Sequence, residues 1–349
     1  MKFLKFYYTV FSTILVLSCT DPKMSKSSEN DSNNINNKFA LGIENDLKFM
    51  NLQKHPKSIK EFKYNAIIKD REVFPDSNNN KKEDIFYSFN KRGNLIEKIE
   101  YAKSIAGSSK HSKYYYDGDG NTIEINNSDS KYIYEYDSLN RKILEVFYSP
   151  KNKIYSKQKF VFNTENNLEK REWFLPNGDL KNRQLFYYDS VGNKTKAIMY
   201  KKDKISFSEI IEHKTDDSLR IHKHYNADNT LNRKAIYKIT DNYEEVTSFN
   251  ELENKTGHAI NYYDTLKRHT GWEGFNLDGT SKGKRTIEYD RLGNKILEKT
   301  TPSENHSSIM DKLEEFVYEH DKNNNWIKKV RIYNEEPTTI IIREIEYYQ

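Results

Sequence analysis

Thr286–Lys299 reads TIEYDRLGNKILEK, and shorter or blurred copies of this stretch recur from about residue 85 to about residue 335. Apolar and polar residues alternate in its first half, which is the period of a strand with one packed face. Asp290–Asn294 then turns the chain, because an Asp oxygen accepts a backbone N–H two residues on and Gly293 allows a positive φ. Lys295–Lys299 returns as the partner strand. The stretch therefore predicts a β-hairpin, and its recurrence predicts a row of hairpins.

The residues around each turn test this repeat. When the copies are aligned on their first turn residue, nine of ten preceding positions are Phe or Tyr, against an aromatic content of 13%. Three residues after it, eight of ten positions are Gly or Asn, which enter the left-handed region most readily. The ten aligned residues are Asn90, Asp117, Asp137, Asn163, Asp189, Asn226, Asn250, Asp264, Asp290 and Asp321. The predicted structural turn residues are Gly93, Gly120, Gly178, Gly192, Gly279, Gly293, Asp137, Asp189 and Asp290.

A larger duplication overlies the hairpin repeat. Asn177-Gly178 and Asp278-Gly279, pairs favoured in tight hairpin turns, each lie 11 residues before an aligned turn residue. A shift of 101 places superposes the two stretches and about four hairpin-sized units around them. Residues 205–252 fit the repeat less well. They are either repeats whose sequence has diverged or a longer insertion.

The first 48 residues predict export and anchoring. Residues 1–18 combine Lys2 and Lys5 with a short apolar run, as in a signal peptide. The sequence Val16-Leu17-Ser18-Cys19 resembles the lipobox of bacterial lipoproteins, in which the cysteine is acylated, for example with palmitate. The alternative is a free thiol in a signal anchor. We expect the protein to be attached to a membrane through Cys19, with a flexible tether over residues 19–48. We expect it at the outer membrane, on its periplasmic or cell-surface face.

Composition favours an all-β domain over residues 49–349, built of antiparallel hairpins in an extended or curled sheet. Only 35% of residues are hydrophobic, but 26 Tyr and 18 Phe suit amphipathic strands. Cys19 is the only cysteine, so no disulfide stabilises this domain. The formal charge of +5 falls to +3 without the signal peptide, and this excludes nucleic acid as an expected partner.

The pattern Y-x-Y-D-x-x-G-N, clearest at residues 134–141, 186–193 and 287–294, resembles the YD repeat of the Rhs family. The Asn-Gly and Asp-Gly units resemble the MORN-variant hairpin. In large Rhs proteins the resemblance implies a spiralling sheet around a toxic C-terminal domain, but this chain lacks an Asp-Pro-x-Gly motif and ends in repeat-like sequence. Small repeat lipoproteins of Bacteroidota type are the closer resemblance.

Metal-binding patterns are weak in this sequence. Asp117–Asn121 is similar to a calcium loop, but Thr122 and Ser128 stand where that loop needs Gly and Glu. Turn chemistry explains it better. His222 and His224 share one face of a predicted strand without a third ligand at a recognisable spacing. We therefore expect no metal and no cofactor.

Candidate functional residues are few. Trp173, Trp272 and Trp326 form a candidate aromatic binding surface for a glycan or protein ligand, although packing between repeats is the default explanation. No catalytic motif is present, and carboxylates such as Glu244, Glu245 and Glu273 cannot be paired from sequence. The sequence predicts a non-enzymatic binding or scaffolding surface. The alternatives are a cell-envelope glycan hydrolase and, by Rhs analogy, a toxin-associated or immunity protein.

Overall fold

The computed structural model describes residues 46–70, 72–76, 83–101, 109–214, 218–303 and 311–349. The compact unit that contains them spans Glu44–Gln349. The predicted signal peptide, Cys19 and most of the predicted tether lie outside the described residues. The elements are α2 (Asp46–Phe49), β1 (Pro56–Lys69), β2 (Glu72–Pro75), β3 (Glu83–Phe89), β4 (Leu95–Glu100), β5 (Lys110–Tyr116), β6 (Thr122–Asn127), β7 (Ser130–Tyr136), β8 (Lys142–Tyr148), β9 (Ile154–Phe162), β10 (Leu168–Phe174), β11 (Leu180–Tyr188), β12 (Lys194–Lys201), β13 (Lys204–His213), β14 (Leu219–Asn226), β15 (Leu231–Ile239), β16 (Tyr243–Phe249), β17 (Lys255–Tyr263), β18 (His269–Phe275), β19 (Ser281–Tyr289), β20 (Lys295–Pro302), β21 (Lys312–His320), β22 (Trp326–Tyr333) and β23 (Glu336–Tyr347).

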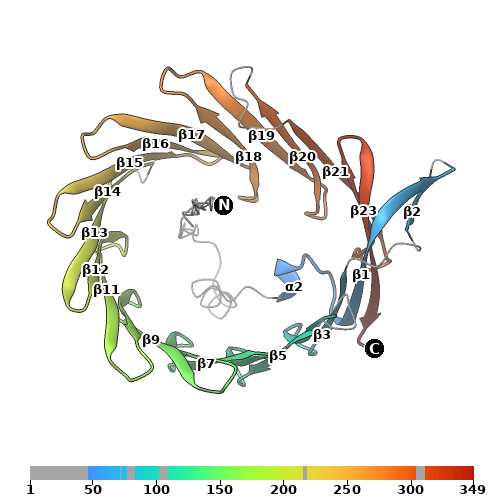
Figure 1. Ribbon diagram of the computed structural model, residues 1–349, viewed down its shortest axis with the longest axis horizontal. Coiled ribbons are helices and arrows are strands. Elements are labelled where there is room, and N and C mark those ends of the chain that lie inside the picture. Colours follow the sequence, from blue (N-terminus) through green and yellow to red (C-terminus); the bar gives the residue numbers. More distant parts are fainter. Residues whose placement is uncertain (1–45, 71, 77–82, 102–108, 215–217, 304–310) are drawn as a thin grey trace, which may run out of the picture. The chain divides into compact units, whose positions relative to one another are not determined.

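The strands form a closed antiparallel barrel. From β3 to β23 each strand pairs with the next one along the chain, and β1 pairs with β23 on one side and with β3 on the other (Figure 1). The barrel therefore has 22 strands, and β2 pairs only with the far end of β1. The prediction of hairpins is confirmed, but the prediction of an extended or curled sheet is wrong. Closure pairs both edges of the meander, which removes the unpaired backbone groups that an open sheet would expose.

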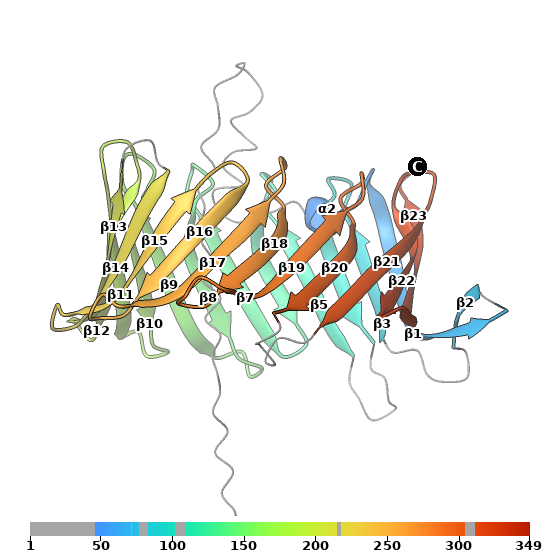
Figure 2. The ribbon, with the colours of Figure 1, turned by 90° about the horizontal axis from the view of Figure 1, so that it is seen from above.

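The barrel is wide, and its strands are inclined to its axis (Figure 2). With neighbouring strands about 4.8 Å apart, 22 of them give a circumference of at least roughly 105 Å. Side chains on the inner face therefore meet their sheet neighbours rather than the opposite wall. Within the described ranges no helix has the length and apolar character needed to cross a bilayer.

The turns use the chemistry that the sequence pattern indicates. At Asp290, the carboxylate Oδ1 accepts the backbone N–H groups of Leu292 at 2.9 Å and Asn294 at 2.8 Å. The backbone closes the same loop, since Gly293 N–H donates to the carbonyl of Asp290 at 3.0 Å. A β-bulge follows on the return strand. Positive φ values are found at Gly93 (83°), Gly120 (85°), Gly178 (92°), Gly192 (88°), Gly279 (87°) and Gly293 (86°).

Two of the aligned turn residues lie at the other end of the barrel. Because the strands alternate in direction, the turns at Asn226 and Asn250 follow β14 and β16, which run opposite to the strands that precede the other eight turns. Residues 205–252 are therefore not an insertion, and β13–β16 continue the meander in register. The turns at the expected end begin at Lys214 and Thr240, and the Thr240 hydroxyl accepts the N–H of Tyr243 at 3.1 Å in place of an Asp oxygen.

Handedness explains why the aromatic residue of the repeat changes face between the two ends. The twist of the strands gives every hairpin the same handedness. Consecutive turns of one meander lie at opposite ends of the strands, so equivalent turn positions point to opposite faces of the sheet. Tyr289 shares its face with Ile287, on the inner side of the barrel, whereas Tyr225 lies on the face opposite to His224 and Arg233.

Inner tyrosines tie neighbouring hairpins together. The Tyr188 hydroxyl donates to the carbonyl of Leu168 at 2.9 Å, and Tyr289 donates to His269 at 2.9 Å. The same bond is made by Tyr116 to Leu95, Tyr136 to Thr122 and Tyr318 to Lys295. Burial raises the pKa of Tyr136 and of Tyr318 to about 12, which keeps both hydroxyls protonated as donors.

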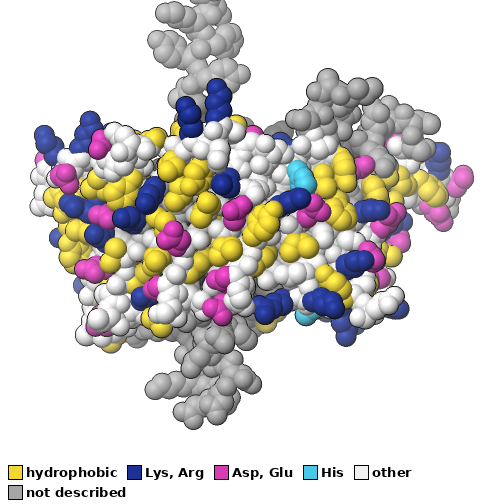
Figure 3. Space-filling view, turned by 90° about the horizontal axis from the view of Figure 1, so that it is seen from below, with side chains coloured by type: hydrophobic (Ala, Val, Ile, Leu, Met, Phe, Trp, Pro, Cys, Tyr) yellow, Lys and Arg dark blue, Asp and Glu magenta, His cyan; other side chains and the backbone are white. Residues whose placement is uncertain are grey.

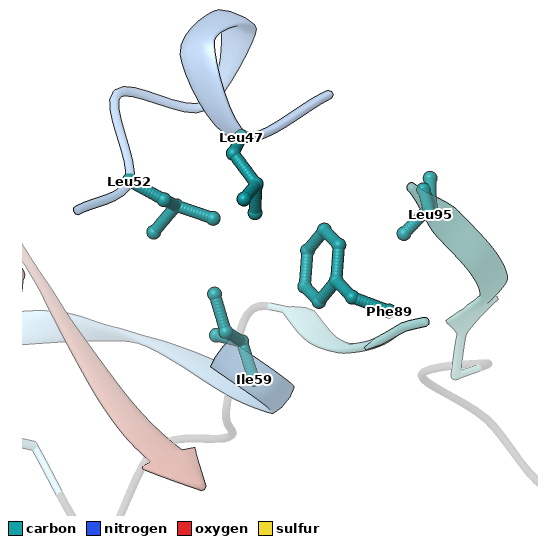
Figure 4. Close-up of a cluster of buried hydrophobic side chains, with 5 residues drawn as sticks. All are labelled: Leu47, Leu52, Ile59, Phe89 and Leu95. Atoms are coloured by element: carbon teal, nitrogen blue, oxygen red, sulfur yellow. The ribbon is translucent and has the colours of Figure 1, made fainter. Parts of the chain in front are cut away.

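Residues 46–55 cover the seam where the barrel closes. Leu47 and Leu52 pack on Ile59, Phe89 and Leu95 in a cluster of buried hydrophobic side chains (Figure 4). Polar contacts extend this seam to distant turns. The Asn51 amide donates to Asn294 Oδ1 at 2.7 Å, Gln53 N–H donates to Asn325 Oδ1 at 2.7 Å, and Leu95 N–H donates to Asp46 Oδ2 at 2.8 Å. The segment therefore connects the last two hairpins to the first.

Candidate binding face on the inner wall

Contacts with α2 identify the inner face of the barrel. Figure 1 shows α2 inside the ring, and Leu47 of this helix packs on Ile59 and Phe89. Side chains alternate between faces along a strand, and directly paired residues share a face. Ile59 and Phe89 face inward, and the pairing of each strand with the next then identifies the inward-facing residues around the barrel.

The outer face mixes charged and apolar side chains along the strands. Figure 3 shows basic, acidic and hydrophobic groups interspersed on the side it presents. Mid-strand outer charges include Lys159, Glu172, Lys223, Glu245, Glu288 and Lys328. Some pair across strands, as in Lys328 Nζ to Glu319 Oε1 at 2.6 Å and His258 Nε2 to Glu245 Oε1 at 2.9 Å. This face has the composition of a water-exposed sheet surface.

The inner wall carries rings interleaved with cations. Lys142 lies over Tyr134 and Phe160 with its ammonium 5.2 and 5.1 Å from the ring centroids, and Lys329 lies 4.6 Å from Phe316. Tyr132 stacks on Phe147 at 4.7 Å. Carboxylates balance part of this charge, at Glu145, Glu298 and Glu314. The inner wall is therefore an amphipathic surface that offers ring faces and basic groups together.

On β9–β11 this wall is tightly filled. The guanidinium of Arg171 lies 4.7 Å from the ring of Trp173 and 5.3 Å from that of Phe160. Its Nη2 donates to Gln158 Oε1 at 2.7 Å. Burial lowers the pKa of Arg171, while Glu145 opposes that shift. The Arg171 guanidinium and the Gln158 amide thus each contact other side chains of the wall.

On β17–β19 small residues stand beside Trp272, so this part of the wall is more open in composition than β9–β11. The indole lies over Gly274, where an added Cβ would be 2.6 Å from two ring atoms. Gly274 pairs with Ala259 on one side and with Gly283 on the other, so three small residues stand in one row. In the next row Trp272 stands between Asn261 and Arg285. The ring therefore lies over its own strand, with an amide and a guanidinium at the paired positions on either side.

The two regions are the halves of the duplication predicted from sequence. The 101-residue shift maps β9–β12 onto β17–β20, and the pairings Phe160–Arg171–Gln184 map onto Asn261–Trp272–Arg285. The row Gln158–Trp173–Asn182 maps onto Ala259–Gly274–Gly283. One backbone arrangement therefore holds a filled wall in the first half and an open one in the second.

A carboxylate and two histidines lie together on the inner face of β13 and β14. His222 Nδ1 donates to Glu209 Oε1 at 3.0 Å, and His224 Nε2 lies 3.6 Å from the same oxygen. Burial opposes ionisation of Glu209, but the hydrogen bond from His222 and the charges of Lys194 and both histidines lower its pKa to about 2. Burial lowers the pKa of His224 despite Glu209. Across the described ranges, no group of three or more His, Cys, Asp or Glu side chains is placed to hold a metal ion.

The three carboxylates considered for hydrolysis do not converge. Glu244 pairs with Asn261 on the inner face, where burial raises its pKa against the opposing charges of Arg220 and His222. Glu245 and Glu273 both pair with Ile260 and lie on the outer face, where Glu273 accepts the Tyr262 hydroxyl at 3.4 Å. A sheet therefore separates Glu244 from the other two acids.

The structure separates the three tryptophans. Trp173 and Trp272 lie on the inner wall, in adjacent rows of the two duplicated halves. Trp326 is buried near the seam, with the Arg343 guanidinium 3.3 Å from its ring centroid. The Asp117 carboxylate, part of the calcium-like stretch, accepts the N–H groups of Asp119 at 3.0 Å and Asn121 at 2.8 Å, as in the other turns.

Sequence reasoning missed the cations that accompany the rings. A charge on an amphipathic strand normally faces water, yet Arg171, Lys142 and Arg285 all face inward. A signal was present, because Arg171 and Trp173 are two residues apart and so must share a face. Choosing the inner face, however, requires the contact with α2, which no strand pattern contains.

The comparisons with known proteins give a loose likeness of architecture. No family model and no curated protein matches the chain. The TcdB2-TccC3 structure without its hypervariable C-terminal region is 10% identical over 74% of this chain, with a TM-score of 0.26. This chain spans only 19% of the length of that one.

Two porin-like proteins are also similar. The one from Bacteroides uniformis is 9% identical, with 84% of this chain and 99% of that chain covered and a TM-score of 0.26. The one from Bacteroides vulgatus is 8% identical with the same coverage and a TM-score of 0.20. All three likenesses are distant, with TM-scores of 0.26 or less.

Proposed function

We propose that this protein is an exported, lipid-anchored binding protein whose inner barrel wall is the binding surface and that it acts without catalysis. The observation that supports this most directly is the arrangement of rings and cations on one face of a closed sheet. Arg171, Lys142 and Lys329 each lie within 5.3 Å of at least one aromatic centroid on that face. Such a surface recognises polar ligands that have an apolar face.

The charged side chains of the outer face favour water rather than lipid around the barrel, and this is consistent with binding at the inner wall. Charged side chains such as Lys159, Lys223 and Glu288 stand at mid-strand on the outside. A Lys or Arg at the midplane of a bilayer costs about 2–4 kcal/mol, so this composition favours water around the barrel. Attachment through an acylated Cys19 would then hold a water-surrounded barrel at the outer membrane, on its periplasmic or cell-surface face.

The binding proposal is tested with the chain beginning at Thr20, which lacks the acylated cysteine. The probes are defined acidic oligosaccharides, neutral oligosaccharides and peptides, and retention on each is measured. Phe160→Ala removes an inner ring, and Tyr187→Ala is the matched control because Tyr187 is 44% exposed on the outer face of a nearby strand. We expect binding to at least one probe to be lost in the Phe160→Ala variant and retained in the Tyr187→Ala variant. The reverse result would assign binding to the outer face.

The anchoring proposal has its own test. In the full chain, Cys19→Ala should abolish labelling by an alkyne fatty acid and release the protein from the membrane fraction. Labelling that persists in this variant would show that the lipid is attached elsewhere or that the signal is retained as an anchor.

A further inference from the structure

We propose that the inner wall at β17–β19 contains a subsite for an acidic sugar ring, in which Trp272 stacks against the sugar and Arg285 pairs with its carboxylate. This inference rests on the proposed function, because it assumes that ligands reach the inner wall. It goes further by naming one position on that wall and one class of ligand.

Trp272 has the placement of a stacking platform. Its ring atoms Cζ2 and Cη2 lie over Gly274, 2.6 Å from the position that an added Cβ would take, so no side chain separates this part of the indole from the strand. The residue is partly exposed, whereas Gly274 beneath it is buried. A partly exposed indole that rests against backbone suits the C–H face of a pyranose, which is apolar and nearly planar.

Small residues stand beside the ring, so large side chains do not cover its flanks. Ala259, Gly274 and Gly283 form one paired row next to Trp272 on the inner face. In the first half of the duplication the same places hold Gln158, Trp173 and Asn182. The side chains that fill the wall there are therefore missing beside Trp272, where the ring would otherwise be covered.

Arg285 supplies the charge for an acidic ligand. It pairs directly with Trp272 across the strands, and its side chain is 44% exposed. Its nearest carboxylate, Glu298, is 3.5 Å from Nη1, but that carboxylate also contacts Lys295 at the shorter distance of 2.6 Å. The guanidinium thus keeps donors for a second carboxylate, which it binds in a bidentate geometry.

Asn261 completes the recognition chemistry. It stands on the other side of Trp272 from Arg285, on the same inner row. A primary amide both donates and accepts, so it matches the hydroxyl groups of a sugar. An aromatic platform between an amide and a guanidinium selects a uronic acid over a neutral hexose, because only the acid uses the guanidinium.

The test uses the chain beginning at Thr20 and the linear trimer of galacturonic acid as the probe. The matched neutral probe is the same trimer with its carboxylates methyl-esterified. Tryptophan fluorescence and calorimetry measure the dissociation constant. We expect the esterified trimer to bind at least about tenfold more weakly, since a charge-assisted hydrogen bond contributes about 1.5–3 kcal/mol.

Two substitutions and one control locate the subsite. Trp272→Ala and Arg285→Gln should each weaken binding of the acidic trimer at least about tenfold, whereas Arg285→Gln should barely change binding of the esterified trimer. Lys284→Gln removes a neighbouring outer charge and should leave both constants unchanged. Arg285→Gln keeps the test valid if Trp272→Ala fails to fold, because the side chain of Arg285 is 44% exposed.

The outcomes separate this inference from the proposed function. No binding of the acidic trimer, or equal binding of both trimers, would overturn the acidic subsite. Binding that is lost on Arg171→Gln but unaffected by Trp272→Ala and Arg285→Gln would also overturn it, and inner-wall binding would stand. Binding lost on Lys284→Gln and kept by the inner variants would overturn both.

Discussion

The two halves of the duplication, β9–β12 and β17–β20, share a backbone and differ in what their inner wall contains. Both make the same turn hydrogen bonds, Gly192 to Asp189 at 3.1 Å and Gly293 to Asp290 at 3.0 Å. Yet the first half places Trp173 where the second has Gly274. Turns and pairing are therefore retained where the inner side chains have diverged.

The difference shows which interactions the barrel depends on. In a single wide sheet, inner side chains meet their neighbours in the sheet and no opposite layer, so replacing one does not unpack a shared core. Turn geometry is less tolerant, because a bulge or turn residue sets the register of two strands. The inner wall can therefore change for a ligand while the framework remains.

The largest expected effect concerns Glu209, in the wall between the two halves. Its pKa is lowered from 4.5 to about 2, so its ionised form contributes stability above pH 4.5 that is lost as the pH falls toward 2. The shift corresponds to about 3 kcal/mol. Urea unfolding of wild type and Glu209→Gln should differ by about this amount at pH 7 and converge near pH 2. A constant difference across that range would show that the ion cluster does not form.

Substitutions in equivalent turns should break both halves alike. Gly192→Val and Gly293→Val place a β-branched residue at φ values of 88° and 86°, which should cost about 1–3 kcal/mol each. An added Cβ would lie 3.4 Å from Arg268 Nη1 at Gly293 and 3.9 Å from the Asn167 amide at Gly192, which is ordinary van der Waals contact, so the two losses should be similar. Thermal unfolding measures both, and unchanged melting would contradict the turn geometry.

Truncating the two tryptophans should distinguish the filled wall from the open one. Trp173→Ala removes the ring on which Arg171 stacks and should cost about 2 kcal/mol, whereas Trp272→Ala should cost about 1 kcal/mol. Urea unfolding of the two variants gives the comparison. Equal losses would indicate that Trp272 is held by contacts as extensive as those of Trp173.

The smallest expected loss of stability concerns a tyrosine hydrogen bond that both halves make. Tyr188→Phe and Tyr289→Phe each remove one hydroxyl that donates to a carbonyl at 2.9 Å, so each should cost about 1 kcal/mol. Because the two bonds correspond under the 101-residue shift, equal losses are expected, and the double variant should show their sum. Tyr187→Phe, on the outer face, is the control, and a similar loss there would remove the hydrogen bond as the explanation.

Much of the hairpin architecture could be predicted from local sequence. The turn at Asp290–Asn294 is specified by its own five residues, because the Asp290 carboxylate and Gly293 stabilise the turn from within it. The end of the barrel at which a turn lies could not be predicted in the same way. Asn226 and Asn250 begin turns with the same backbone hydrogen bonds as the other turns, and only counting strand directions through β13–β16 separates them.

The candidate site was less accessible from sequence than the fold. Trp173 and Trp272 were identified, but their partners Arg171 and Arg285 were not, since a charge on an amphipathic strand normally faces water. The opposite positions of Glu244 and Glu245 follow from alternation alone, whereas which one faces inward depends on the contact of Leu47 with Ile59 and Phe89.

By itself the sequence determined the strands, the turns and the duplication, because hydrogen bonds within hairpins and two-residue alternation are short-range properties. The tertiary structure alone decided that the sheet closes and which face is inner. Closure joins β1 to both β3 and β23, and the pairing of Ile59 with Ile345 spans almost the whole domain. Such a contact leaves no local pattern, since an edge strand and a paired strand have the same alternation.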